Sequence, residues 1–374
     1  MLRSRIVAIL FVCFLWIPLL NMAFRIVDDI PAADYRALAQ YPARDTELRD
    51  FPAKFQDYFH DNFSFRNILI QLNGTVHYSL LKTSTNDDVM IGKEGWLFYT
   101  ADNLMDDYHG KIIMNNDEME QARRFFNRLE AFIESKGAKF LLAVCPNPQT
   151  IYPEYLPDYE KYSTGNPGRL DQYIDYFRQH NGPDIVDFRP ALLDAKRSSD
   201  EVLYFSNDTH WNYFGASIAF RELINRVNEL GISVEIPPYS VQKGAEWTGD
   251  LTRMIAATTV PKSVLHNFVF SPETSVQVKS NWEDTIYNQV SNAENGLKAV
   301  FIADSYSIPW RALIGATFAE SRIMQGEQDN TDIRKIMEEY TPDIVIYEFV
   351  ERALLYWNGF DLERLEGLSS GETL

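Results

Sequence analysis

Apolar and polar residues follow one another in blocks along the chain, and the lengths of these blocks predict an α/β fold. Short continuous apolar runs, typical of buried strands, alternate with longer amphipathic patterns, typical of helices. We expect strands at 138–146, 183–188, 298–304 and 342–350, and helices at 115–137, 168–180 and 212–231. Apolar strands alternating with helices indicate a mostly parallel sheet with helices on both faces. We place this α/β domain at 86–360.

Three other stretches follow different patterns. Aromatic residues near helical spacing at 50–81 predict one or two amphipathic helices, within a juxtamembrane linker and helical segment at 26–85. The stretch 86–99 has glycines around a turn and predicts a hairpin. The stretch 236–297, rich in Thr, Val, Ser and Pro, is expected to be an irregular insertion that leaves the core, and 361–374 a C-terminal tail.

The first 25 residues are expected to be a membrane anchor. After Arg3 and Arg5, nineteen residues from Ile6 to Phe24 carry no charge and a single polar side chain, Asn21. As a helix this run spans roughly 28 Å, which is close to the thickness of a bilayer core. A cleaved signal peptide is the alternative, but its apolar run is shorter and ends at small residues. We therefore expect a single-pass membrane protein with Arg3 and Arg5 on the cytoplasmic side and its later residues outside.

Composition and charge narrow the function. The chain has 374 residues, 45% of them hydrophobic, and a formal net charge of −18. Such an acidic chain is not expected to bind nucleic acid, because proteins bind the phosphate backbone through Lys and Arg. Its two cysteines, Cys13 and Cys145, are not expected to pair, and the usual Cys and His spacings of thiol metal sites are missing. We expect no metal and no cofactor.

A candidate nucleophile follows the apolar run 298–304. Ser305 comes directly after Asp304, where the predicted strand gives way to a helix. A hydroxyl at such a turn is lifted above the sheet edge, and backbone N–H groups at the helix start favour negative charge there. The alternative is that Asp304 or Ser305 only caps the helix.

A candidate base lies in the stretch SNDTHWNYFG at 206–215. Asp208 and His210 are two residues apart, so the carboxylate can reach the imidazole in a bent turn. Histidine titrates near neutral pH and is the usual base for a hydroxyl, and a carboxylate partner fixes its tautomer. The pair is also compatible with a local turn or with two metal ligands. The proline-rich stretch 145–157 either lines a substrate site at the same sheet edge or is a rigid turn.

Several motifs in a fixed order resemble the alginate O-acetyltransferase family (the AlgJ and AlgX type), whose catalytic domain is related to the SGNH hydrolases. The similarity covers roughly residues 46–355. Ala303 stands where the family commonly has glycine, and Asn147-Pro148-Gln149 where relatives often have a lysine. The motifs are GKEGWLFY, IYPEYLP, NDTHWNYFGA, GDLTRM, ADSYS and PDIVIYEFVER.

The resemblance implies an SGNH-hydrolase-like fold of three layers and an acyl-serine mechanism. It implies Ser305 as nucleophile, His210 as base and Asp208 as its partner, and the Ser305 amide as part of an oxyanion site. The expected reaction is acetyl transfer to hydroxyls of a polysaccharide. The resemblance places it at the bacterial inner membrane, with the catalytic domain on the periplasmic or extracellular side. The expected acetyl supplier is a multi-spanning membrane O-acyltransferase (MBOAT type). An esterase with the same three residues and a non-catalytic subunit of a polysaccharide export complex remain alternatives.

Overall fold

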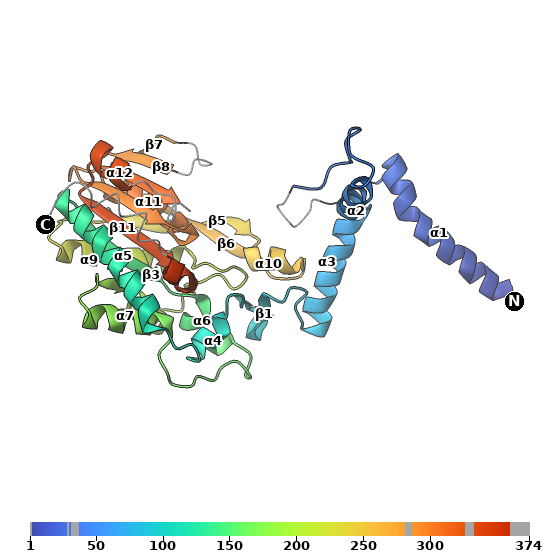
Figure 1. Cartoon of the computed structure of the whole chain (residues 1–374), viewed down its shortest axis with the longest axis horizontal. Helices are drawn as coiled ribbons and strands as arrows, with labels where there is room; N and C mark the ends of the chain where they lie inside the picture. Colours follow the sequence, from blue (N-terminus) through green and yellow to red (C-terminus); the bar gives the residue numbers. More distant parts are fainter. Residues whose placement is uncertain (1, 28–29, 31–36, 281–285, 326–332, 360–374) are drawn as a thin grey trace. The chain divides into compact units, whose positions relative to one another are not determined.

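The computed structural model describes residues 2–27, 30, 37–280, 286–325 and 333–359 (Figure 1). Contacts between residues divide the chain into two compact units. The first comprises Met1–Ile91 with Asp250–Pro261, and the second Gly92–Gly249 with Lys262–Leu374. The expected tail at 361–374 lies outside the described residues. The two units are taken in turn.

The first unit is mainly helical. Two helices, α2 and α3, occupy the stretch in which one or two amphipathic helices were predicted, and α10 packs near strand β1. Gly74 of α3 permits a close approach to the α10 segment, since a Cβ at this position would lie 2.1 Å from the carbonyl oxygen of Ile255. The elements of this unit are α1 (Leu2–Phe24), α2 (Phe51–Asn62), α3 (Arg66–Val76), the π-helical segment η1 (His77–Leu81), β1 (Val89–Ile91) and α10 (Asp250–Ile255).

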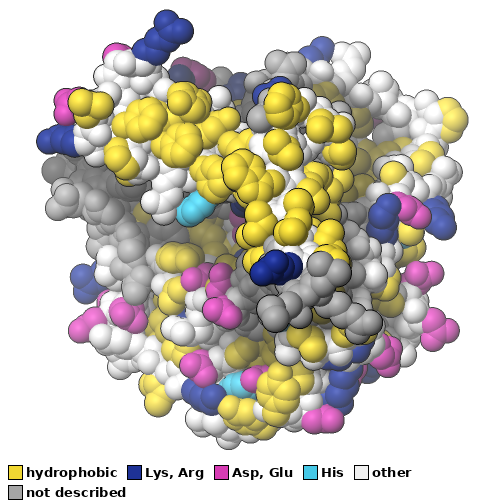
Figure 2. Space-filling view, turned by 90° about the vertical axis from the view of Figure 1, so that its right-hand side faces the viewer, with side chains coloured by type: hydrophobic (Ala, Val, Ile, Leu, Met, Phe, Trp, Pro, Cys, Tyr) yellow, Lys and Arg dark blue, Asp and Glu magenta, His cyan; other side chains and the backbone are white. Residues whose placement is uncertain are grey.

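Helix α1 is long and apolar enough to cross a membrane, as the sequence predicted. Figure 2 shows hydrophobic side chains gathered in a continuous band along it. Exposed apolar surface of this extent is costly in water and suits a lipid environment. The exposed apolar residues of α1 include Ile6, Val7, Ile9, Leu10, Phe11, Phe14, Leu15 and Trp16.

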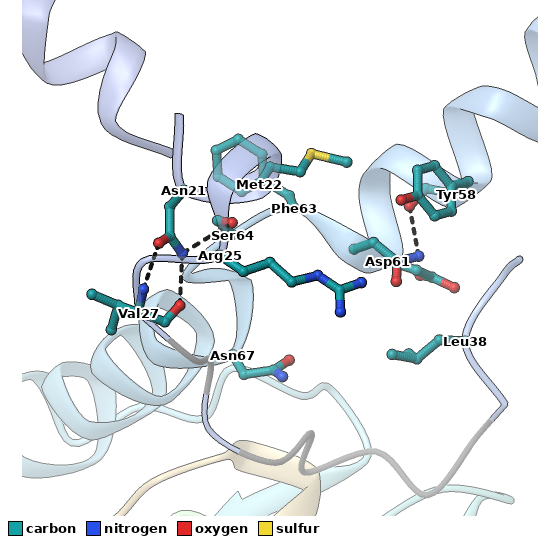
Figure 3. Close-up of a pocket in the computed structure, with 11 residues that line it drawn as sticks. Asn21, Met22, Arg25, Val27, Leu38, Tyr58, Asp61, Phe63, Ser64 and Asn67 are labelled. Carbon is teal, nitrogen blue, oxygen red and sulfur yellow. Dashed lines mark hydrogen bonds between the residues drawn. The ribbon is translucent and has the colours of Figure 1, made fainter. Parts of the chain in front are cut away.

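The polar residue of this apolar run, Asn21, is fully engaged at the end of α1. Its amide donates hydrogen bonds to the Val27 carbonyl oxygen (2.8 Å) and the Ser64 hydroxyl (3.3 Å), and its Oδ1 accepts from the Val27 N–H (2.8 Å) (Figure 3). These bonds satisfy a side chain that would otherwise be costly to bury. They also tie the end of α1 to the segment that follows α2, beside a cavity of about 260 Å³.

The second unit is built on a seven-stranded sheet in the order β4-β3-β11-β9-β10-β8-β7. The five strands from β4 to β10 are parallel to one another. Beyond β10, β8 runs antiparallel to β10, and β7 runs antiparallel to β8. The strands of this unit are β2 (Leu97–Tyr99), β3 (Lys139–Cys145), β4 (Ile185–Asp187), β5 (Tyr239–Trp247), β6 (Ser263–Phe270), β7 (Val276–Val278), β8 (Ile286–Ser291), β9 (Lys298–Ala303), β10 (Glu320–Gln325) and β11 (Ile344–Val350).

Helices cover both faces of the sheet, as expected for the three-layer fold. On one face, alternate residues of β3, β9 and β11 are buried with α5, α7 and α12 in one hydrophobic core. The intervening residues point to the other face, where α11 packs on β8 and β10. The helices are α4 (Leu104–Tyr108), α5 (Asn116–Ser135), α6 (Pro148–Ile151), α7 (Arg169–Gln179), α8 (Arg189–Ser198), α9 (Tyr213–Glu229), α11 (Arg311–Thr317) and α12 (Ile333–Glu339).

The expectation that 236–297 leaves the core is wrong for part of this stretch. Strand β8 pairs with β10, and β7 pairs with β8, so both extend the central sheet. Among the described strands of this stretch, β5 and β6 form a separate two-stranded ribbon. The prediction was wrong because β7 and β8 are only partly buried, so they lack the continuous apolar run of the central strands.

Candidate active site

Ser305 begins a short 3₁₀ segment, Ser305–Trp310, directly after β9. Asp304 caps this segment, because its Oδ1 accepts a hydrogen bond from the Tyr306 N–H (2.8 Å). Its Oδ2 accepts from the N–H of Val350 at the end of β11 (2.7 Å), which ties the turn to the neighbouring strand. The capping role therefore falls to Asp304, and Ser305 remains half-buried at the carboxyl edge of the sheet. Ala303 fits as a regular strand residue.

His210 and Asp208 lie at the tip of a tight turn. Its two arms are held together by the Asn212 N–H, which donates to the Leu203 carbonyl (2.9 Å), and by an antiparallel bridge between Tyr204 and Trp211. Asn212 then caps α9 through its side-chain oxygen. The turn is thus fixed on both sides, by its own pairing and by the start of a long helix.

The structure brings the three predicted residues into one chain of hydrogen bonds. His210 Nε2 and Ser305 Oγ are 2.7 Å apart, and His210 Nδ1 and Asp208 Oδ1 are also 2.7 Å apart. An ionised carboxylate only accepts hydrogen bonds, so it selects the tautomer with the proton on Nδ1. Nε2 then carries the lone pair that can accept the Ser305 hydroxyl proton. Asp208 is 3% exposed, whereas the side chain of His210 is 24% exposed and open to a reactant.

A third group holds the Asp208 carboxylate. The indole N–H of Trp247, at the end of β5, donates to Asp208 Oδ2 (3.0 Å). Asp208 Oδ1 also accepts from the backbone N–H of His210 (3.1 Å), so the local-turn interpretation is realised as well. Sequence reasoning missed Trp247, because it lies in the stretch expected to leave the core, and a single tryptophan there carries no recognisable signal.

The histidine turn and the serine turn are also joined away from the reacting atoms. Trp211 donates its indole N–H to the Tyr306 carbonyl (3.0 Å), and the Tyr306 hydroxyl donates to the Thr209 carbonyl. The Tyr306 ring lies 5.0 Å from the His210 ring and 5.1 Å from that of Trp211. These contacts fix the separation of two turns that are 95 residues apart in the chain.

A buried acid lies behind the serine turn. Glu348, in the middle of β11, is fully buried; it accepts from the Asp304 N–H (3.1 Å) and the Cys145 thiol (2.9 Å). Burial, and then the charge of Asp304, raise the pKa of Glu348 well above its ordinary value. A lone glutamate in the apolar strand IVIYEFV was the available sequence signal.

Comparison with known families places this site in context. Residues 89–311, more than half of the chain, match the family described as "SGNH hydrolase-like domain, acetyltransferase AlgX". The matched range contains Asp208, His210 and Ser305. It also contains β3, β9 and the serine turn that follows β9.

Individual relatives are more distant. The chain is 22% identical over 322 residues to a probable alginate O-acetylase AlgJ of Pseudomonas syringae pv. tomato, with 80% of this chain and 77% of the relative covered. It is 24% identical over 205 residues to the corresponding protein of Pseudomonas aeruginosa, with 53% of this chain and 48% of the relative covered.

Two solved structures share the fold. The O-acetyltransferase domain of Pseudomonas putida AlgJ has a TM-score of 0.53 at 18% identity, covering 76% of this chain and 99% of that domain. Bacillus cereus PatB1 has a TM-score of 0.53 at 14% identity, covering 72% and 97%.

Proposed function

Because the chain belongs to the family of SGNH hydrolase-like domains typified by the acetyltransferase AlgX, we propose that it transfers acetyl groups to hydroxyls of a polysaccharide through an acetyl-Ser305 intermediate. The observation that carries this mechanism is the continuous hydrogen-bonded chain from Ser305 through His210 to Asp208. The names of its relatives, alginate O-acetylases, support acetyl as the group transferred.

The first half-reaction forms the acyl-enzyme. Ser305 Oγ attacks the carbonyl carbon of an acetyl donor while His210 Nε2 takes the hydroxyl proton. Asp208 stabilises the resulting imidazolium through Nδ1. When the tetrahedral intermediate collapses, the leaving group receives that proton, and the acetyl group remains on Ser305.

The oxyanion needs backbone donors near Ser305. Asp304 already uses two amides of this turn, because the Tyr306 N–H bonds to its side chain and the Ser307 N–H to its carbonyl (3.2 Å). Among the described residues, nothing accepts a hydrogen bond from the Ser305 N–H. This amide, at the start of the 3₁₀ segment, is therefore the donor we assign to the oxyanion.

The second half-reaction delivers the acetyl group. His210 removes the proton from a sugar hydroxyl, and the oxygen attacks the acetyl-serine, which regenerates the free Ser305. If water attacks instead, the same site acts as an esterase. Helix α1 and the AlgJ relatives support anchoring in the inner membrane with the site on the periplasmic side. There, a multi-spanning membrane O-acyltransferase would supply the acetyl groups.

Intact-mass spectrometry of the full chain with p-nitrophenyl acetate tests the mechanism. We expect a gain of one acetyl group in the wild type and none in Ser305→Ala, because removal of a nucleophile lowers such rates by about 10³-fold or more. Ser307→Ala is the matched control: the Ser307 hydroxyl lies in the same turn but donates to the Asp304 carbonyl (2.7 Å). Acetylation of Ser305→Ala to the wild-type extent would refute the assignment and favour a non-catalytic role.

Adding an acceptor glycan separates transferase from esterase. A transferase moves the acetyl group from Ser305 to the glycan, where mass spectrometry detects it. Release of free acetate alone at saturating glycan would identify an esterase.

A further inference from the structure

A polar cavity of about 220 Å³ lies in the second unit, at the carboxyl ends of β3 and β11. Its lining includes Asn147 and Thr150, which follow β3, and Glu351, which follows β11. The residue before Glu351 is Val350, whose N–H bonds to the Asp304 side chain at the serine turn. The cavity and the candidate active site therefore share one edge of the sheet.

Buried polar side chains with unused hydrogen-bonding capacity converge on this cavity. Asn147 is 3% exposed, Gln149 2% and Glu351 8%. Within the described part of the chain, Asn147 Oδ1 has no hydrogen-bond partner. Glu351 accepts from the Asn147 N–H (2.8 Å) and the Thr150 hydroxyl (2.7 Å), and both of these bonds use Oε2. Buried polar groups are normally satisfied, so this convergence indicates a ligand.

The remaining lining defines the chemistry of that ligand. Tyr108 is half-buried and adds an aromatic side chain to the wall, while Ser163 and Asn166 are exposed at the rim. Amide and carboxyl groups bond to neighbouring hydroxyls, and an aromatic side chain packs on the apolar face of a sugar ring. The volume is below the roughly 300–1,000 Å³ of pockets for drug-sized ligands, so it suits one sugar unit.

The charges of the lining oppose an anionic sugar. Asp107, Asp171 and Glu351 supply carboxyl groups, and Arg189 is the cation among the lining residues. Its Nη2 already lies 2.8 Å from both Asp171 and Asp187. The carboxylate of a uronic acid would therefore meet acidic groups, while Arg189 is already engaged by two carboxylates.

We propose that this cavity is a subsite for an uncharged sugar residue of the acceptor polysaccharide, held by Asn147, Gln149 and Glu351. This inference rests on the proposed acetyl transfer for its biological setting, but the binding itself requires no catalysis. The proline-rich loop 145–157 then lines the substrate site through Asn147, Gln149 and Thr150. The acceptor bound here differs in charge from alginate, the polymer in the names of the relatives.

Binding to full-length Ser305→Ala protein in detergent, measured by calorimetry, tests the subsite without turnover. The probes are β-1,4-linked hexasaccharides of mannose, glucose and N-acetylglucosamine, with the hexasaccharide of mannuronic acid as the charged counterpart of the first. We expect at least one neutral probe to bind, and the mannuronate probe to bind about tenfold more weakly than mannohexaose or not at all. Tighter binding of mannuronate, or no binding of any neutral probe, overturns the proposal.

Substitutions locate the binding. Glu351→Gln and Gln149→Ala are each expected to weaken binding of the neutral probe by about tenfold, the effect of losing one hydrogen bond of roughly 1.4 kcal/mol. Asn225→Ala, in a separate cavity that includes Asn228 and Pro237, is the matched control and should bind normally. Thermal melting of each variant verifies folding. If neither cavity variant weakens binding while both remain folded, the site is elsewhere and the proposal fails.

Calcium tests a metal site as the other occupant of these carboxyl groups. Calcium alone, titrated into the same full-length protein, is expected not to bind at this cavity. Calcium binding that is weakened by Glu351→Gln and that excludes the neutral sugar would overturn the subsite.

The binding and acetylation experiments together keep this proposal separate from the catalytic one. If the neutral probe binds but the wild type is never acetylated on Ser305, the catalytic proposal fails and the subsite stands. If Ser305 is acetylated but no neutral probe binds, the subsite fails and the catalytic proposal stands.

Discussion

Trp247→Phe tests whether the Asp208 carboxylate must be held in place for catalysis. The substitution removes one indole N–H, which donates to Asp208 Oδ2 at 3.0 Å, and keeps most of the aromatic volume. A hydrogen bond to a charged group contributes about 1.5–3 kcal/mol. With about 1.4 kcal/mol for each factor of ten in rate, the loss corresponds to a kcat lower by about 10-fold to 150-fold.

The assay is the pre-steady-state release of p-nitrophenol from p-nitrophenyl acetate, which reports acylation of Ser305. We expect the maximal rate constant of acylation to fall and the donor concentration that gives half of this rate to stay unchanged. The reason is that Trp247 contacts Asp208 and has no proposed role in binding the donor. Glu246→Gln is the control from the same strand; its carboxylate is exposed and pairs with Lys262 (3.1 Å), and wild-type kinetics are expected.

A double-mutant cycle distinguishes positioning from a general loss of structure. If Trp247 acts through Asp208, Trp247→Phe costs little in an Asp208→Ala background, where the carboxylate is already missing. The same fold-loss in both backgrounds would refute the reasoning, as would wild-type acylation by the single variant.

Three other substitutions or deletions follow from the structure. Burial raises the pKa of Glu351 to about 7, so the folded state binds its proton more tightly than the unfolded state and stability falls as pH rises from about 4.5 through 7. The resulting loss of unfolding free energy over this pH range is about 3 kcal/mol. Urea unfolding at pH 5 and pH 8 should therefore show a smaller change in unfolding free energy for Glu351→Gln than for the wild type; an equal change in both proteins would contradict the prediction. Asp304→Ala removes the acceptor for the N–H groups of Tyr306 and Val350 and should cost about 2 kcal/mol or more in unfolding free energy as well as acylation activity, whereas a wild-type melting curve would argue against that role. Deletion of residues 2–24 should move the protein from the membrane to the soluble fraction of cells, and N-terminal sequencing of the intact protein that begins after this segment would show cleavage instead of anchoring.

The fold could be predicted to the extent that burial was visible in the sequence. Strands β3, β9 and β11 are buried on both faces, so each is a continuous apolar run. Strand β10 was not anticipated, because ESRIMQ begins with three polar residues and contains only two consecutive apolar ones. Strands β7 and β8 were missed for a related reason: both are only partly buried, so neither shows a continuous apolar run.

The candidate site could be predicted through residues that are chemically unusual in their positions. A histidine two residues after an aspartate, and a serine after an apolar strand, are visible in the sequence, and the structure places them within hydrogen-bonding distance. Their catalytic role stays a prediction. Trp247 and the lining of the cavity depend on how distant segments meet, and ordinary residue types such as Gln149 give no sign of this.

The cross-links between the two turns, Trp211 to the Tyr306 carbonyl and Tyr306 to the Thr209 carbonyl, bypass the imidazole and the serine hydroxyl altogether. Variants that lack the serine hydroxyl or the imidazole should consequently keep the wild-type arrangement of the two turns. Ser305→Ala or His210→Ala can then serve as a faithful trap, able to capture an acceptor or a donor-delivering partner in the native arrangement without consuming it.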